Sequence, residues 1–245
     1  MINSLSIIFP VFNEQNRINN SLNKLKKFIF ISKIEFLEII FIDDGSKDKT
    51  YFIIQNFIER FKFNKNINIY LLKNIKNFGK GYSLKKGVAY SKAEWILTVD
   101  IDLSVDLNQL DQWNKNKLLN NNCFIYFGSR IHKNSKVKKS ILRYLLGLLF
   151  RILIYFLFRI KINDTQCGYK LYKNLVAKKI FSKLKDYRYA HDIEIVLIAN
   201  LMKIVIKELP VKWIHRSNSK LNIFIDPLIM FWHLLLIKKR FLNRI

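Results

Sequence analysis

The sequence has little cysteine, proline or glycine, with two, three and seven of them among 245 residues. Cys123 and Cys167 provide neither a disulfide framework nor the spacing of a metal site, which favours a reducing compartment. No Gly/Ser-rich or Pro-rich linker and no internal repeat divides the chain. The length therefore suits one domain of ordinary size that can bury a core of its own.

Acidic residues are also few. Lysine and arginine number 43 and aspartate and glutamate 18, so the formal net charge is +25. A charge of this size attracts polyanions, anionic lipid or phosphorylated substrates. The abundance of Lys, Asn and Ile throughout the sequence is an alternative source of the charge, which would then lie on solvated faces without a partner. The charge alone does not identify a partner.

No apolar run is long and uninterrupted enough to cross a membrane as a helix. The most apolar stretch, at about 138–160, contains Arg143, Arg151 and Arg159. One arginine at the centre of a spanning helix costs about 2.5–3.5 kcal/mol. On a helix these arginines share one side, so we expect a basic stripe on an apolar helix that lies at a membrane surface. The alternative is a core helix whose arginines pair with acids.

The last segment, residues 222–245, has a similar character. Asp226 and Pro227 can begin a helix, and basic residues end it. Its apolar run, 227–237, is shorter than the ~20 residues of a membrane span. We expect a second amphipathic helix that associates with a membrane through apolar and snorkelling basic side chains. A helix docked on the protein is the alternative.

These features predict where the protein is found. The amino terminus lacks a basic leader, and Pro10 interrupts its apolar run, so we do not expect a signal peptide. We expect a domain over 1–221, which includes the helix at about 138–160, followed by a membrane-associating helix over 222–245. The protein is then peripheral or monotopic on the cytoplasmic face of a membrane.

What the sequence does contain is an alternation of β-rich runs and helical patterns. The alternation predicts an α/β protein whose central sheet is mostly parallel and flanked by helices. Ligands of such sheets bind beyond the carboxyl ends of the strands. The predicted strands are 5–12, 37–44, 67–73, 95–102 and 124–129.

Polar residues follow three of these strands. They are Asn13 and Glu14 after the first, Asp43 and Asp44 after the second, and Asp100 and Asp102 after the fourth. The last two carboxylates repel each other unless a positive charge lies between them. Mg²⁺ is commonly shared between one or two carboxylates and substrate phosphates, so this D-x-D pattern favours a metal that bridges to a diphosphate. Helix caps and turns are the structural alternative.

Two further segments carry possible binding groups. In "NFGKGYSLKKG" (77–87), Gly79 and Gly81 flank Lys80 ahead of a helix, where backbone amides and an ammonium can approach phosphate. The segment is neither a P-loop nor a dinucleotide fingerprint, and it could also be a plain helix start. In "IDDGSKDKT" (42–50), Asp43 and Asp44 can accept hydrogen bonds from a pyrimidine imide or a ribose hydroxyl. A turn that caps the next helix is the alternative.

In this order and spacing the motifs resemble glycosyltransferase family 2, whose members have the GT-A fold and use nucleotide-diphosphate sugars. Later motifs resemble its polyisoprenyl-phosphate branch, and within it the dolichyl-phosphate glucosyltransferases. The resemblance runs from about residue 5 to the end and has no Q-x-x-R-W motif of processive synthases. It rests on "SIIFPVFNEQNRI", "IIFIDDGSKDKT", "NFGKGYSLKKG", "TVDIDLS", "FGSR", "DTQCGYKLY", "AHDIEI" and "LPVKWIHRSNSKL".

The resemblance implies roles for the donor-binding residues. Lys80 would steady the diphosphate, Asp100 would contact the donor, and Asp102 would hold Mg²⁺ or Mn²⁺ against the diphosphate oxygens. Ser104 stands where mannosyl-transferring relatives often have glutamine, which favours a glucosyl donor. The pocket for base and ribose would be lined by Pro10, Asn13, Glu14, Asp43 and Asp44.

The resemblance also implies the acceptor chemistry. Arg130 and Arg143 would receive the phosphate of a polyisoprenyl lipid, since the arginine fork donates paired bonds to phosphate. A phosphate monoester is mostly dianionic at neutral pH and needs no strong base, so we expect single displacement with inversion. Asp192 would act as a base or would only position substrate. The expected reaction transfers glucose from UDP-glucose. Donors such as GDP-mannose or a UDP-GlcNAc type, and glycan or protein acceptors, are alternatives.

Two other classes of function fit the sequence less well. A nucleic-acid-binding module would use the positive charge, but the sequence lacks a groove-reading motif, and the strand-end carboxylates would repel phosphates without a metal. We therefore expect no nucleic-acid partner. A catalytically silent membrane scaffold would have no use for the D-x-D carboxylates.

Overall fold

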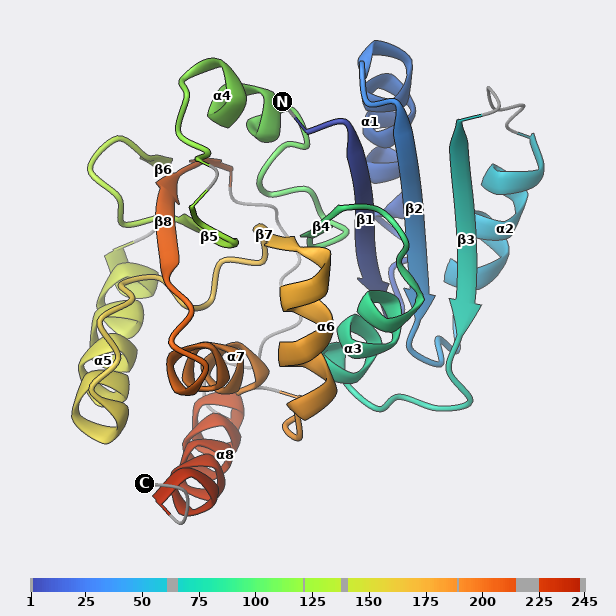
Figure 1. Cartoon of the computed structure of the whole chain (residues 1–245). Coiled ribbons are helices and arrows are strands. Elements are labelled where there is room, and N and C mark those ends of the chain that lie inside the picture. Colours follow the sequence, from blue (N-terminus) through green and yellow to red (C-terminus); the bar gives the residue numbers. More distant parts are fainter. Residues whose placement is uncertain are drawn as a thin grey trace.

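A computed structural model describes residues 2–60, 66–120, 122–137, 141–188, 190–214 and 225–242. Its centre is a seven-stranded sheet in the order β3-β2-β1-β4-β7-β5-β8 (Figure 1). Every pairing is parallel except those of β7, which runs antiparallel to β4 and β5. The strands are β1 (Ser4–Val11), β2 (Phe36–Asp43), β3 (Ile67–Lys73), β4 (Trp95–Thr98), β5 (Ile125–Ser129), β7 (Lys170–Lys173) and β8 (Ile206–Pro210).

The predicted strands are all present in this sheet, and its mostly parallel character is confirmed. The fourth predicted run, 95–102, is strand only as far as Thr98, because the chain turns after Val99 to place Asp100 and Asp102 in a loop. β7 and β8 were not predicted as strands. β7 has only four residues, and β8 contains lysine and glutamate, so neither has a long apolar pattern.

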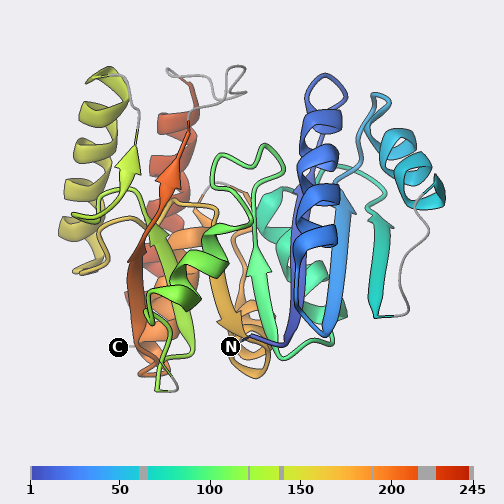
Figure 2. The same cartoon turned by 90° about the horizontal axis from the view of Figure 1, so that it is seen from above.

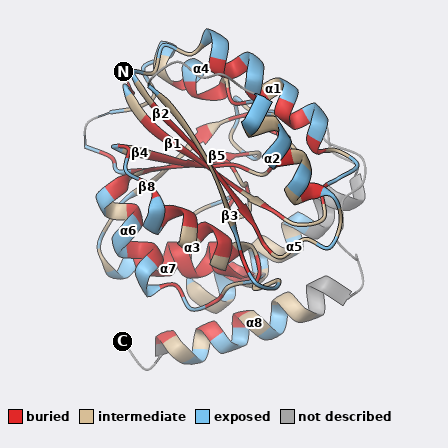
Figure 3. Ribbon diagram, turned by 90° about the vertical axis from the view of Figure 1, so that its right-hand side faces the viewer, coloured by how far each residue is buried: buried red, intermediate tan, exposed pale blue. Residues whose placement is uncertain are grey.

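Helices cover both faces of the sheet because successive side chains of the strands alternate between two cores. Ile7 and Phe9 point into one core, and Ile8 points into the other. The first core is covered by α1 (Ile18–Ile31), α2 (Thr50–Arg60) and α4 (Gln109–Lys115), and the second by α3 (Lys80–Tyr90), α6 (Asn174–Lys183) and α7 (His191–Leu201). Figure 3 shows these layers on either side of the sheet.

Two longer helices, α5 (Ile141–Phe158) and α8 (Ile225–Leu242), add to the second core. They lie on the half of the molecule that holds β5 and β8, away from β3 (Figures 1 and 2). A small parallel sheet pairs β6 (Lys136–Val137) with β9 (Lys212–Trp213). Among the described residues, none of the helices combines the length and hydropathy that crossing a bilayer requires.

The exposed side of α5 is apolar. Ile154 is buried in the second core, whereas Leu149, Ile152 and Phe156 are 64%, 45% and 69% exposed. The predicted basic stripe is not continuous. Arg151 is half-buried, and Arg159 lies beyond the end of the helix with a φ of 55°. The side chain of Arg143 is outside the described part of the chain.

One side of α8 is docked on the protein, as one of the two predicted alternatives has it, and the other side is apolar and exposed. Leu234, Ile237 and Phe241 are buried. The exposed apolar residues of the opposite side are Phe231, Trp232, Leu235 and Leu236. The helix begins at Ile225, and the segment 215–224 before it is outside the described residues.

Candidate functional site

The carboxyl ends of β1, β2 and β4 meet at one edge of the sheet and bring the predicted donor-binding residues together. Val11, at the end of β1, is paired in register with Asp43, at the end of β2. β4 pairs with the other side of β1, and the amide of Val99 donates to the carbonyl of Ile8. The loops with Asn13, Asp43 and Asp100 therefore leave the sheet side by side, as expected for a ligand site of a parallel sheet.

Lys80 and Asp100 form an ion pair at this edge, with Nζ 2.5 Å from Oδ1. Burial on its own would lower the pKa of Lys80, but Asp100 and Asp192 outweigh it and raise the pKa. Desolvation likewise opposes the charge of Asp100, yet the attraction of Lys80 leaves the pKa of Asp100 below its ordinary value. Both groups are charged at neutral pH, and Lys80 neutralises the first carboxylate of the D-x-D pattern.

Asp102 has a different environment. Its Oδ1 accepts a bond of 2.9 Å from the amide of Ser104, and its Oδ2 is 4.0 Å from the guanidinium of Arg17. The Arg17 guanidinium also forms an ion pair with Glu14. Each carboxylate of the pair thus has its own protein cation nearby, which reduces the repulsion that two adjacent aspartates would otherwise feel.

The loop after β1 is fixed to the loop after β2. The amide of Asn13 donates to Ser46 Oγ over 2.9 Å, and the Asn13 side-chain oxygen accepts a bond of 2.9 Å from the amide of Lys47. The backbone amide of Glu14 donates to Thr50 Oγ1 over 2.6 Å. Pro10 lies next to Ile42 in the paired strands and is partly buried. These contacts hold the predicted base and ribose pocket together.

Asp43 and Asp44 are adjacent in sequence and serve different purposes. Both oxygens of Asp44 accept bonds from segment 74–79, including 2.8 Å from the backbone amide of Gly79 and 2.8 Å from the side-chain Nδ2 of Asn74, so Asp44 anchors that segment. Asp43 is fully buried, and burial raises its pKa. Its Oδ1 accepts from the Ser46 amide, whereas its Oδ2 has no hydrogen-bond partner among the described residues.

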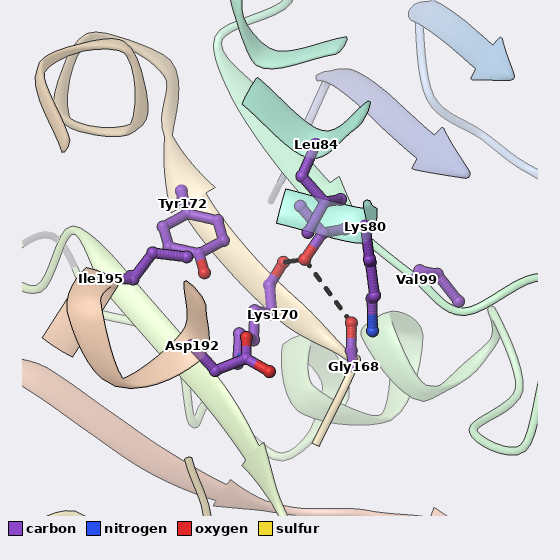
Figure 4. A pocket seen from close by; sticks show the side chains of 9 residues that line it. Lys80, Leu84, Val99, Gly168, Lys170, Tyr172, Asp192 and Ile195 are labelled. Atoms are coloured by element: carbon purple, nitrogen blue, oxygen red, sulfur yellow. Dashed lines mark hydrogen bonds and ion pairs between the residues drawn. The ribbon is translucent and has the colours of Figure 1, made fainter. Parts of the chain in front are cut away.

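Asp192 lies in the first turn of α7 and forms a buried ion pair with Lys170 of β7. Burial would raise the pKa of Asp192, but His191, Lys170 and Lys80 outweigh it and lower the pKa to about 2. Lys170 is 2% exposed, and its ammonium also lies 4.7 Å from the ring centroid of Phe127. Figure 4 shows Lys80, Asp192 and Lys170 around one narrow space that Gly168, Tyr172 and Ile195 also line.

The glycines around Lys80 allow close packing against another loop. The φ of Gly79 is 107°, and a Cβ there would lie 2.3 Å from the carbonyl oxygen of Tyr187. A Cβ on Gly81 would lie 2.8 Å from the Cβ of His191. Residues 79–81 therefore rest on the segment that leads into α7, which explains both glycines without a bound phosphate.

Arg130 follows β5 and is held by Asp164. Its Nε and one terminal nitrogen each donate to the Asp164 carboxylate over 2.8 Å, and its backbone amide donates over 2.7 Å. Burial opposes the charge of Arg130, but Asp164 outweighs that effect, and Asp100 also contributes to raising the pKa. Asp100 is thus close enough to Arg130 to influence its pKa, and part of the Arg130 fork is already engaged by Asp164. Arg143, the other predicted phosphate ligand, has a side chain outside the described residues.

Sequence reasoning missed three charged residues of the site: Arg17, Asp164 and Lys170. Arg17 follows Glu14 by one helical turn, a spacing that permits an ion pair. Asp164 and Lys170 both stand in the motif "DTQCGYKLY". Their partners are 34 and 22 residues away along the chain, so no local pattern predicts the pairs.

The residues at the sheet edge fit a divalent ion that takes most of its ligands from elsewhere. The described residues contain no group of three or more His, Cys, Asp or Glu side chains arranged to hold a metal. Mg²⁺ commonly takes one or two protein carboxylates and completes its shell with substrate phosphate and water. Asp102 suits this role because its side chain is 23% exposed and Asp100 is already neutralised by Lys80.

The same fold occurs in solved glycosyltransferases. Glucosyl-3-phosphoglycerate synthase from Mycobacterium tuberculosis, solved with Mn²⁺, UDP-glucose and phosphoglyceric acid, aligns with a TM-score of 0.65 and 14% identity over 95% of this chain and 77% of that one. The likeness confirms the predicted GT-A fold.

Sequence comparison identifies the family. Dolichyl-phosphate beta-glucosyltransferase of Dictyostelium discoideum is 35% identical over 97% of this chain and 75% of the relative. The human enzyme of the same name is 34% identical over 98% of this chain and 76% of the relative. The family model for glycosyl transferase family 2 matches residues 6–181. As its motifs predict, this chain belongs to glycosyl transferase family 2.

Proposed function

We propose that this glycosyltransferase moves glucose from UDP-glucose to a polyisoprenyl phosphate of the dolichyl type, with inversion at the anomeric carbon. The observation that carries the proposal is the likeness, over 97% of the chain, to a dolichyl-phosphate beta-glucosyltransferase. The site agrees with it, since the carboxylates and cations at the sheet edge suit a nucleotide diphosphate and an anionic acceptor.

The donor would bind with its base near Asp43. A buried carboxylate oxygen without a hydrogen-bond partner is costly, and an imide N–H of uracil is the kind of donor that would satisfy Asp43 Oδ2. Pro10, Asn13 and Glu14 would border the base and ribose from the adjoining strand. Asp44 would contribute by holding the neighbouring segment in place.

The diphosphate would lie over the ends of β1 and β4. Lys80 would donate to it and hold Asp100 toward the sugar, and Asp102 would bind Mg²⁺ or Mn²⁺. The bound ion would stabilise the negative charge that develops on the departing UDP. Arg17, beside Asp102, is a further cation at this position.

The acceptor would supply its own nucleophile. The second pKa of a phosphate monoester is about 6, so its oxygens are largely ionised at neutral pH and need no strong base. Asp192 is poorly suited as a base, because its pKa of about 2 makes it a weak proton acceptor at neutral pH. We assign Asp192 to positioning. Arg130, and Arg143 if its side chain reaches the site, would receive the phosphate.

The lipid chain of the acceptor would approach from a membrane surface. The outward sides of α5 and α8 expose large apolar residues, including Phe156 at 69% and Trp232 at 62%. The net charge of +25 favours anionic headgroups. These features support a peripheral or monotopic protein on the cytoplasmic face of a membrane.

A direct transfer assay tests the proposed reaction. Purified protein incubated with radiolabelled UDP-glucose, Mn²⁺ and a polyprenyl phosphate should move label into organic solvent. Asp102→Asn should reduce the rate by about a hundredfold or more, the usual cost of losing a group that stabilises transition-state charge. Transfer from GDP-mannose or UDP-GlcNAc in place of UDP-glucose would contradict the assigned donor, and transfer only to a glycan or protein would contradict the assigned acceptor.

A further inference from the structure

Helix α8 presents two chemically different sides. Its outer side is the apolar surface of Phe231, Trp232, Leu235 and Leu236, and the exposed Lys239 follows these residues. Its inner side faces α7 and the loop before it, and α8 lies directly against this part of the molecule in Figures 1 and 3. The inner side is composed of His233, Leu234, Ile237, Arg240 and Phe241.

Two buried acids receive the polar residues of this inner side. His233 Nδ1 lies 2.5 Å from Asp186 Oδ2, and a terminal nitrogen of Arg240 lies 3.4 Å from Glu194 Oε1. Asp186 and Glu194 are 5% and 2% exposed. Apolar packing is not directional and would hold the helix at more than one position. The two polar contacts need particular partners, so they fix where along the surface the helix lies.

The same two acids determine the conformation of the segment that leads into α7. Asp186 Oδ1 accepts bonds of 3.1 and 3.2 Å from the amides of Arg188 and Ala190. Glu194 Oε2 accepts bonds of 2.9 and 2.5 Å from the amides of Lys185 and Asp186. A displacement of α8 would therefore be transmitted to residues 185–188 and Ala190 through the side chains that accept their hydrogen bonds.

Residues 185–188 support the start of α3, where Lys80 lies. The carbonyl of Tyr187 accepts a bond of 2.8 Å from the amide of Gly81, and the absence of a side chain at Gly79 and Gly81 lets the two loops touch. Lys85, one turn further along α3, donates to the carbonyls of Ser182 and Leu184 over 3.1 and 3.0 Å. The position of the Lys80 ammonium, 2.5 Å from Asp100, thus depends on this support.

We propose that His233 and Asp186 are positioning residues for the donor site. Their contact ties α8 to segment 185–188, and that segment holds Gly79–Gly81 and hence Lys80 where the diphosphate would bind. Helix α8, whose outer side would contact lipid, thereby influences the affinity of the donor site for the nucleotide sugar. This inference rests on the proposed function for its ligand, although the coupling itself is a property of the fold.

Donor binding to the full chain tests the coupling without turnover. Titration calorimetry with UDP-glucose and Mn²⁺ should give a dissociation constant about fivefold higher or more in His233→Leu than in the wild type, the usual scale of coupling between sites. His233→Asn, whose amide can replace the Nδ1 donor, should restore the affinity. In the transfer assay His233→Leu should raise KM for UDP-glucose and leave KM for the lipid phosphate unchanged.

Trp232→Gln is the matched control, since it changes the adjacent residue on the outer side of the same helix. It should leave the affinity for UDP-glucose unchanged. An unchanged affinity in His233→Leu, or an equal loss in Trp232→Gln, would overturn the proposal. If His233→Leu does not fold, Arg240→Gln severs the other polar contact of the inner side and should weaken donor binding in the same way.

Amide hydrogen exchange separates this inference from the assignment of the donor. Without any ligand, the Gly81 amide should exchange faster in His233→Leu than in the wild type or Trp232→Gln, because its acceptor is the Tyr187 carbonyl. Equal rates in all three proteins would refute the coupling. Failure of the wild type to bind UDP-glucose would instead count against the proposed function, and the exchange measurement would still decide the coupling.

Discussion

At the scale of single residues, the site is made of opposite charges in alternation. Asp100 and Asp192 are each held by a lysine, Lys80 and Lys170, and Lys80 is influenced by both acids. Such an arrangement keeps carboxylates ionised although they are close together. It also predicts that a variant without one member of an ion pair is less stable than a variant without both members, because the single variant leaves an unpaired charge buried.

Lys170→Met should therefore destabilise the protein by about 3–5 kcal/mol, the cost of leaving one member of a buried ion pair without its partner. Methionine fills similar space, so the loss reflects the uncompensated charge of Asp192 more than a cavity. Urea unfolding followed by circular dichroism measures it. The double variant Lys170→Met with Asp192→Asn should recover a large part of the loss. If the double variant is as unstable as the sum of the single ones, the two residues are not coupled as described.

Gly168→Ala should disrupt the site and leave the rest of the fold intact. A Cβ at this position would lie 2.2 Å from Asp100 Oδ2, so the carboxylate would have to leave its place beside Lys80. We expect a loss of transfer activity of at least tenfold, with a near-native circular dichroism spectrum, on the scale of a misplaced catalytic group. Gly147→Ala is the control, because nothing lies within 4 Å of a Cβ there. Retained activity in Gly168→Ala would show that transfer does not require the Asp100 carboxylate to lie beside Lys80.

At the scale of elements, α5 and α8 are unusual in exposing large apolar side chains. The inner side of α8 is partly polar, with His233 and Arg240 facing acids, while its outer side carries Trp232 and Leu236. A helix that only covers a core in water exposes a polar side to the solvent. The distribution fits a helix that contacts protein on one side and lipid on the other.

Replacing Trp232 and Leu236 together with glutamine should weaken binding to vesicles that contain phosphatidylserine by about tenfold or more, since two large apolar side chains no longer enter the interface. Sedimentation with vesicles measures the bound fraction. Phe30→Gln, which alters a residue 72% exposed on α1, should have no effect. Equal loss in both proteins would mean that membrane contact is not specific to the outer side of α8.

At the scale of the whole molecule, acid stability should report the buried pair. The pKa of Asp192 lies at about 2, below its ordinary value of 3.8, so its ionised form stabilises the fold above pH 4 and that contribution is lost as the pH falls through about 2. We expect the free energy of unfolding to fall by roughly 2 kcal/mol over this window from this residue alone. Asp192→Asn, compared by denaturant titration at each pH, should show a shallower fall. Parallel curves for the two proteins would contradict the assigned ion pair.

Much of the sheet and part of the site follow from the sequence pattern alone. The strands of the parallel part are apolar runs with clear ends, so their places in the sequence and the gathering of Asn13, Asp43 and Asp100 follow from the pattern. β7 escaped prediction because it has only four residues and begins and ends with lysine. Lys170 is tolerated inside the protein through its ion pair with Asp192, on a helix distant in sequence. The inner contacts of α8 escaped prediction because His233 and Asp186 are 47 residues apart.

The ion pair between Arg130 and Asp164 affects how Arg130 can bind an anion. A free arginine side chain loses conformational entropy when it grips a ligand, at a cost of up to about 2 kcal/mol. Here that ordering is completed when the chain folds, because two nitrogens of the guanidinium and the backbone amide are already fixed. If the acceptor phosphate binds Arg130 as proposed, it would meet a guanidinium whose orientation Asp164 has already fixed, so little further ordering of the arginine would be required.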